Sequence, residues 1–143
     1  MRIQEAAKAS GLPADTIRFY ERQGVVPPPP RRENGYRHYT AEHVATLGLA
    51  KGLRQLGVPL DDIVLILTVA HDGTCSQVRG TMIETFSMVL CDLDLQMSEL
   101  GRVRSQLAAI LEGLTRMRPA DTAVPGVRGC DCVRMVTGNN PPS

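Results

Sequence analysis

Apolar residues recur at helical spacing near the start of the chain and predict two short helices. The first covers residues 3–10 and stops before Gly11, because glycine favours the backbone conformation that ends a helix. Pro13 suits the first turn of the second helix, which runs to Gly24. Two short helices joined by a glycine-containing turn predict a helix-turn-helix.

A proline run and a hairpin signal follow these helices. Residues 27–30 are all proline and cannot lie inside a helix, because proline lacks the backbone N–H donor. Asn34 and Gly35 both tolerate positive φ and are flanked by Tyr and Arg, which suits a hairpin of two short strands. Residues 31–39 are therefore predicted to form a β-wing beside the helix-turn-helix.

Two more helices are predicted after the wing. Thr40 has the character of an N-cap, and the helix that it opens stops at Gly57. Pro59 opens the next helix, whose apolar residues form a buried face, and residues 71–74 break it.

One long helix is predicted from about Cys75 to Met117, where proline is absent and apolar residues are spaced mostly by threes and fours. The seam consists of Met82, Phe86, Leu90, Leu93, Met97, Leu100, Leu107, Ile110, Leu114 and Met117. A small monomer cannot bury a seam of this length, so the pattern favours a coiled coil between two copies of the chain. The alternative is a helix that packs on its own N-terminal domain.

Charge and composition narrow the function. Residues 1–56 carry nine Lys and Arg against five Asp and Glu, a net +4, whereas residues 57–143 carry seven against ten, a net −3. A basic front half suggests a polyanionic partner. No apolar run reaches the roughly 20 residues of a membrane helix, and the N-terminus lacks a signal-peptide core, so we expect a cytoplasmic protein with reduced thiols. No nucleophile–base set or phosphate loop suggests an enzyme.

The order of these elements and several short strings resemble the MerR family of transcription regulators. The matching residues are, in order, Thr16–Glu21 (TIRFYE), Gly24, Glu33–Arg37 (ENGYR), Tyr39–Thr40 and Leu56–Gly57. The resemblance is close over residues 1–70 and rests on pattern alone in the long helix. It implies a mainly α fold, with a winged helix-turn-helix (residues 1–70), a long antiparallel coiled-coil dimerisation helix (71–118), and a metal-binding loop and flexible tail (119–143).

Members of this family bind double-stranded promoter DNA as homodimers. In these promoters, the spacer between the two elements that RNA polymerase recognises is too long. The inducer-bound dimer bends and untwists the DNA, which aligns the two promoter elements for RNA polymerase. Distorting a site of this size costs on the order of 1–6 kcal/mol, which many phosphate contacts can offset. The resemblance implies the same activity here, with RNA polymerase as an indirect partner.

The resemblance also implies DNA contacts. Arg18 and Tyr20 lie in the second helix, which should enter the major groove, while Tyr36 and Arg37 correspond to wing contacts with the backbone. Further phosphate candidates are Arg31, Arg32 and Arg54. The alternative for Tyr20 is a core aromatic, and we expect its neighbour Phe19 to lie in the core.

The implied signal is a soft divalent metal ion: Hg, Pb, Cd or Zn. Cys75 occupies the position where sensors of divalent ions carry Cys and sensors of copper-type monovalent ions usually carry Ser. In an antiparallel dimer, Cys75 of one subunit could meet Cys130 and Cys132 of its partner, with Asp131 or His71 as a possible fourth donor. This would couple metal occupancy to the angle between the DNA-binding heads.

The sequence departs from the family pattern in its cysteines. Most such sensors carry a Cys at the end of the dimer helix and another about seven residues later, whereas this chain has Cys130 and Cys132 one residue apart. A thiol or redox switch between these two cysteines is therefore the alternative function. An iron–sulfur cluster is disfavoured because the tail supplies two of the four thiolates required. Cys91 lies beside the apolar seam and is expected to be a packing residue.

Overall fold

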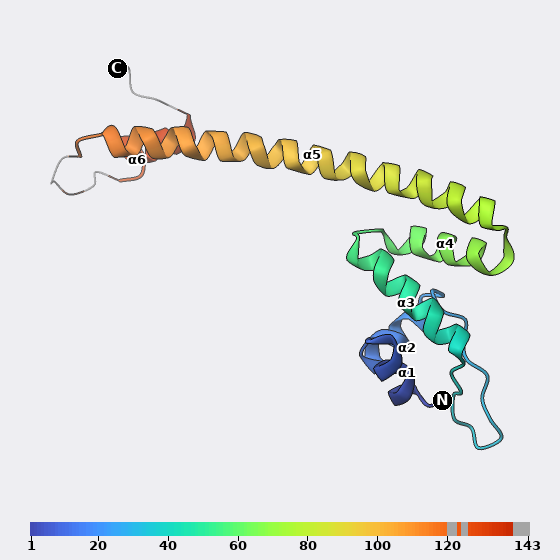
Figure 1. The fold of residues 1–143 in the computed structure, drawn as a ribbon. Helices are drawn as coiled ribbons and strands as arrows, with labels where there is room; N and C mark the ends of the chain where they lie inside the picture. The colour runs from blue at the N-terminus through green and yellow to red at the C-terminus, as the bar shows by residue number, and fades with distance from the viewer. Residues whose placement is uncertain (120–122, 124–125, 139–143) are drawn as a thin grey trace. The chain divides into compact units, whose positions relative to one another are not determined.

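The computed structural model describes residues 1–119, 123 and 126–138. The described residues form six helices (Figure 1). These are α1 (Ile3–Ser10), α2 (Ala14–Arg22), α3 (Ala41–Gln55), α4 (Leu60–Asp72), α5 (Cys75–Arg116) and α6 (Asp131–Thr137). The chain divides into two compact units, Met1–Cys91 and Asp92–Ser143.

Helices α1 and α2 form the expected helix-turn-helix. Gly11 has φ 67°, and its N–H donates to the Ala7 carbonyl oxygen at 2.9 Å, which ends α1 in the left-handed conformation that glycine adopts without strain. Pro13 immediately precedes α2. Ala6 of α1 and Ile17 of α2 are fully buried, so the two helices share one core.

The wing is narrower than the sequence predicts. Its two arms meet in a single antiparallel bridge between Arg31 and Arg37, and the described residues contain no extended strand. A tight turn holds the tip: the Gly35 N–H donates to the Arg32 carbonyl oxygen at 2.8 Å, and Gly35 has φ 78°. The prolines at 27–30 lack backbone N–H donors, which leaves the arm before the bridge little with which to extend a ladder.

The core of the first unit lies where α3 and α4 meet the helix-turn-helix. Leu47 of α3, Ile63 and Ile66 of α4 and Tyr39 before α3 are fully buried. The N–H of His43 donates to the Thr40 hydroxyl at 3.3 Å, which caps α3 as expected. This packing joins α1, α2 and the base of the wing to α3 and α4 in one core.

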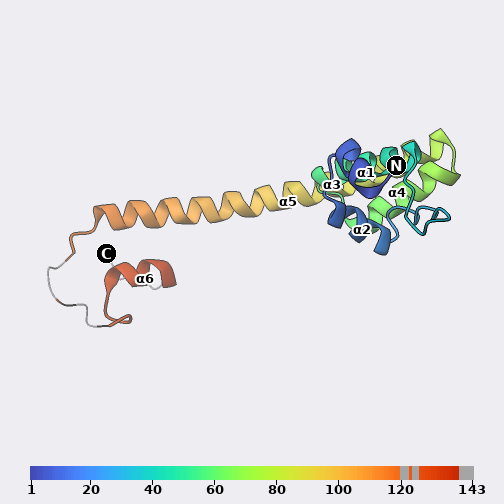
Figure 2. The ribbon, with the colours of Figure 1, turned by 90° about the horizontal axis from the view of Figure 1, so that it is seen from below.

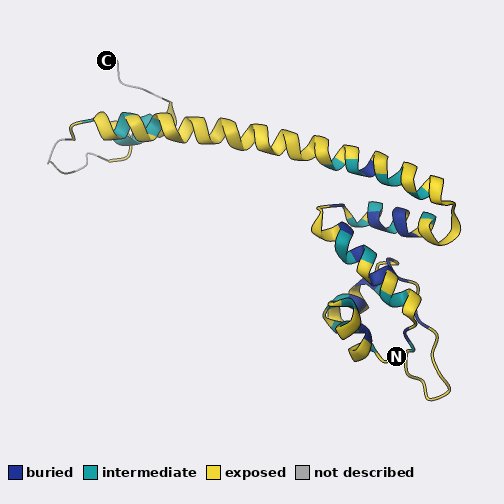
Figure 3. Ribbon diagram, in the orientation of Figure 1, coloured by how far each residue is buried: buried dark blue, intermediate teal, exposed yellow. Residues whose placement is uncertain are grey.

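Helix α5 has 42 residues, and a helix of that length is about 63 Å long. Met82, Phe86 and Val89 pack against the core of the first unit, so the alternative of packing within the chain holds for the first turns (Figure 3). From Leu90 the apolar side chains are mostly exposed: Leu90, Leu93, Met97, Leu100 and Leu107 are 44–69% exposed. The seam therefore divides into a part buried within the chain and a part that solvent reaches.

In the second unit, α6 packs beside the end of α5 (Figure 2). A Cβ atom built on Gly113 would lie 1.9 Å from the terminal methyl group of Met135, so the Met135 side chain occupies the space that glycine leaves. Ile110 and Leu114 near this contact are half-buried. None of the described helices is long and apolar enough to cross a membrane.

Candidate nucleic-acid interface and thiol pair

Four arginines line one open cleft on the first unit. The cleft has a volume of about 360 Å³ and is lined by Arg2, Ile3, Gln4, Arg18, Arg31, Gly35, Tyr36 and Arg37. No acidic residue is among its lining residues. It brings together Arg18, Arg31, Tyr36 and Arg37, four of the seven residues that the sequence predicts to contact DNA.

Arg2 belongs to this cleft, although the sequence pattern did not single it out. Its guanidinium carbon lies 5.2 Å from the centre of the Tyr36 ring, a cation–π distance. Tyr36 is 61% exposed, so its ring is available to a partner as well as to Arg2. The positive charge of Arg2 and its position just before the first predicted helix could have identified it from the sequence.

Arg18 and Arg37 are held in different ways. The Arg18 guanidinium donates to the Asp15 carboxylate at 2.7 Å, but Asp15 is 94% exposed, so solvent weakens this pair. Arg37 Nε lies 3.2 Å from the Glu21 carboxylate, whose side chain is only 6% exposed. The hydroxyl of Tyr39 donates to the other oxygen of Glu21. Burial, and then this hydrogen bond, raise the pKa of Tyr39 well above its usual range, so it stays protonated.

In α2, the exposure of Tyr20 and of its neighbour Phe19 is the reverse of what the sequence predicts. Tyr20 is 5% exposed and belongs to the core, which favours the packing alternative over a phosphate contact. Phe19, expected in the core, is 40% exposed. Ile17 is fully buried and lies three residues before Tyr20, so the two share the inner face of α2 and Phe19 falls beside it. Arg54 lies in the last turn of α3, exposed and outside the residues that line the cleft.

The four cysteines are all free thiols. Cys75 is exposed at the first residue of α5, and Cys91 is exposed rather than packed as the sequence predicts. Cys130 and Cys132 are half-buried at the start of α6. The backbone N–H groups of Val133 and then Cys132 lower the pKa of the Cys130 thiol, which favours the thiolate that a soft metal requires.

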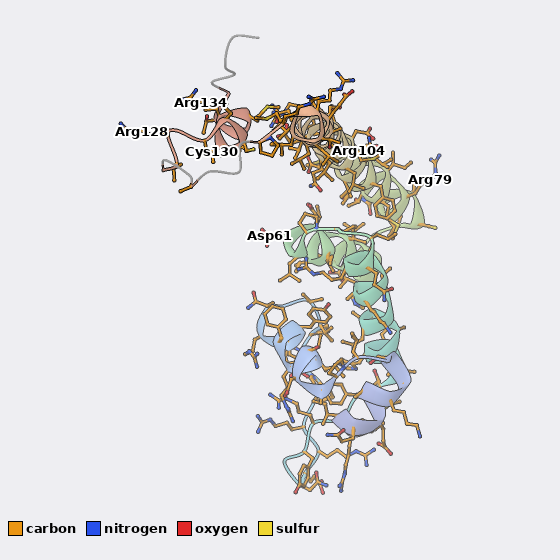
Figure 4. The ribbon with its side chains drawn as sticks, turned by 90° about the vertical axis from the view of Figure 1, so that its left-hand side faces the viewer. Asp61, Arg79, Arg104, Arg128, Cys130 and Arg134 are labelled. Carbon is orange, nitrogen blue, oxygen red and sulfur yellow. The ribbon has the colours of Figure 1, made fainter. Side chains whose placement is uncertain are left out.

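Arg134 of α6 forms hydrogen bonds on both sides of Cys130 in the sequence, and Figure 4 labels it together with Arg128 and Cys130. Its guanidinium donates to the Arg128 carbonyl oxygen at 3.2 and 3.3 Å and to the Asp131 carboxylate at 3.3 Å. Asp131, a possible fourth donor, thus has a cationic partner. His71, the other candidate, lies 3.3 Å from the Thr46 hydroxyl and 3.7 Å from the Glu42 carboxylate. Within the described ranges, no three His, Cys, Asp or Glu side chains of one chain gather as a metal site.

Comparison with known proteins agrees with this geometry. The family model described as "MerR HTH family regulatory protein" matches residues 1–69. The chain is 32% identical over 134 residues to the HTH-type transcriptional regulator CueR of Yersinia pestis, covering 92% of this chain and 86% of that protein. The chain belongs to the MerR family. The regulator is also 30% identical over 112 residues to the HTH-type transcriptional regulator ZntR homolog of Haemophilus influenzae, covering 78% and 82% of the two chains.

Solved structures share the regulator's fold. The transcription regulator PbrR691 from Ralstonia metallidurans CH34, in complex with lead(II), matches with a TM-score of 0.72 and 25% identity, over 95% of this chain and 98% of that one. HiNmlR, a MerR family regulator bound to promoter DNA, matches with a TM-score of 0.56 and 24% identity, over 80% and 93%. The regulator is thus a mainly helical, DNA-binding transcription factor and not an enzyme.

Proposed function

We propose that this regulator is a homodimer that grips promoter DNA through its arginine-lined clefts and distorts it when a soft divalent metal ion binds. In this proposal residues 1–70 bind DNA, residues 71–118 dimerise, and residues 119–143 carry the metal-binding loop. Such a protein acts in the cytoplasm and affects RNA polymerase indirectly, through the shape of the promoter. The clustering of Arg2, Arg18, Arg31 and Arg37 in one cleft is the observation that carries the DNA-binding part.

The DNA contacts follow from the cleft. Arg18 lies in the second helix of the helix-turn-helix, the element that enters the major groove in such motifs. Arg31, Tyr36 and Arg37 reach the same cleft from the wing and suit phosphate contacts, which fix register and orientation. Arg54 is a further phosphate candidate outside the cleft. A phosphate contact from Tyr20 stays a prediction that its burial does not favour.

The dimer contact is proposed along the exposed part of α5. Apolar side chains from Leu90 to Leu111 recur along a helix that extends beyond the first unit. A second copy of the same helix, running antiparallel, would remove these side chains from water and give two DNA-binding heads.

The metal ligands are proposed to be Cys75 of one subunit with Cys130 and Cys132 of the other. In an antiparallel pair, the start of α5 in one chain faces the end of α5 in its partner. Cys130 and Cys132 come after the end of α5, so the partner's thiol pair would lie near Cys75. Three sulfur donors fit a soft ion such as Hg, Pb, Cd or Zn better than a hard one such as Mg or Ca. The similarity to a regulator crystallised with lead(II) supports this class of inducer.

A thiol switch without a metal is the second candidate. The lowered pKa of Cys130, with Cys132 two residues away, favours oxidation of this pair. Lead(II) titration of the reduced protein separates the two functions. The metal hypothesis expects one ion per subunit, seen as a thiolate charge-transfer band with release of protons.

Two variants test the proposed residues. Cys75→Ser should abolish stoichiometric binding of lead(II), whereas the control Cys91→Ser should leave it unchanged. Unaltered binding in Cys75→Ser would exclude Cys75 as a ligand. For DNA, Arg18→Ala should weaken operator binding sharply in a gel-shift titration while the dimer persists in sedimentation, and unchanged affinity would refute the placement of α2 against DNA.

A further inference from the structure

Glu21, in the last turn of α2, carries a nearly buried carboxylate that pairs with Arg37, one of the residues that line the arginine cleft. One oxygen accepts the Tyr39 hydroxyl hydrogen bond, and the other lies 3.2 Å from Arg37 Nε. Tyr39 is fully buried and the Glu21 side chain is 6% exposed. Burying a carboxylate is costly unless it is paired and hydrogen-bonded, so this arrangement ties the DNA-reading helix to the base of the wing.

The same contact leaves part of Arg37 free for another partner. Arg37 is 44% exposed and lines the cleft, and Glu21 engages its Nε atom. In the described part of the chain, no hydrogen bond occupies the two terminal nitrogens of this guanidinium. A planar guanidinium fixed at one nitrogen can present the remaining donors to a phosphate in a set direction.

We propose that Glu21 is a positioning residue for DNA binding: its carboxylate orients Arg37 so that the guanidinium meets a backbone phosphate. This inference rests on the proposed DNA-binding function and adds to it a residue of the wrong charge for a DNA contact. Arg18 differs, because its partner Asp15 is exposed and gives it little restraint.

The direction in which Glu21→Gln changes the affinity for operator DNA tests this role. Removing a negative charge close to a polyanion should tighten binding if Glu21 acts only through its charge. If Glu21 positions Arg37, Glu21→Gln should instead weaken operator binding by about tenfold or more, because the ion pair that directs the Arg37 guanidinium is lost. The glutamine keeps an oxygen that can accept the Tyr39 hydrogen bond. The matched control is Glu33→Gln at the exposed wing tip, which should bind as tightly as the wild type or more tightly.

Salt dependence separates positioning from a general effect on folding. The slope of log affinity against log salt should fall by about 0.9 for each phosphate that the variant no longer neutralises, and a double-mutant cycle with Arg37→Ala should show strong non-additivity. Arg37→Lys keeps the charge but not the fork of donors, and should also weaken binding with a reduced slope. Thermal unfolding of each variant shows whether the first unit remains folded.

The outcomes are distinct. If the wild-type dimer does not bind duplex DNA, the proposed function fails. If the wild type binds and Glu21→Gln binds equally or more tightly, the positioning role alone fails. If Glu21→Gln does not fold, Arg37→Lys decides: weaker binding with a lower salt slope supports the role, and wild-type affinity overturns it.

Discussion

Leu100 offers a quantitative test of the proposed dimer. It lies on the apolar seam of α5, well beyond the part that packs on the first unit, and is 68% exposed. Fully burying a leucine side chain contributes roughly 1.5–3 kcal/mol, so covering two thirds of it contributes about 1–2 kcal/mol per subunit. Leu100→Ala retains Cβ and removes most of this stabilisation, or about 2 kcal/mol per dimer.

This change corresponds to a dissociation constant about 30-fold weaker, measurable by sedimentation equilibrium of the reduced protein. Ser98→Ala is the matched control, because Ser98 is exposed on the same helix outside the seam and should leave dimerisation unchanged. If Leu100→Ala dimerises within about threefold of the wild type, this part of α5 does not form the interface.

Two substitutions and one alkylation measurement test the core, the cleft and the thiol pair. Leu47→Ala should reduce the free energy of unfolding by about 2–5 kcal/mol in urea denaturation, since Leu47 is fully buried; a reduction under about 1 kcal/mol would contradict its core position. Arg2→Ala should weaken operator binding and reduce its salt slope by about 0.9 if Arg2 neutralises one phosphate, and an unchanged slope would exclude Arg2 from the interface. Because the folded state lowers the pKa of Cys130, its alkylation by iodoacetamide should reach half-maximal rate at lower pH in the native protein than in urea; a midpoint at equal or higher pH refutes the shift.

The helices of the first unit were predictable because local sequence signals mark where they begin and end. Gly11 ends α1, Pro13 precedes α2 and Thr40 caps α3, and each acts within a few residues of its own position. The division of the apolar seam was not predictable. Met82 and Phe86 share the spacing of the later members, but they pack against the core of the first unit. Packing against the core of the first unit, rather than the spacing of apolar residues, determines how far along α5 the seam is buried within the chain.

The candidate site was partly predictable for the same reason. The resemblance to the MerR family identified Arg18 and Arg37, because each lies in a short string that matches the family pattern. The burial of Tyr20 instead of Phe19 depends on the rotation of α2 against the core, and adjacent aromatics give no periodic signal to settle it. Glu21 was missed because a buried carboxylate is recognisable only once its partners from the wing are placed beside it.

Mixed dimers test most directly whether two subunits share one soft-metal site. One subunit carries Cys75→Ser and the other carries Cys130→Ser with Cys132→Ser, and each homodimer of these variants should bind no lead(II). If the ligands come from different subunits, the mixed dimer retains one intact site and binds one ion. A mixed dimer that binds no ion, or a Cys75→Ser homodimer that binds two, would contradict the shared site.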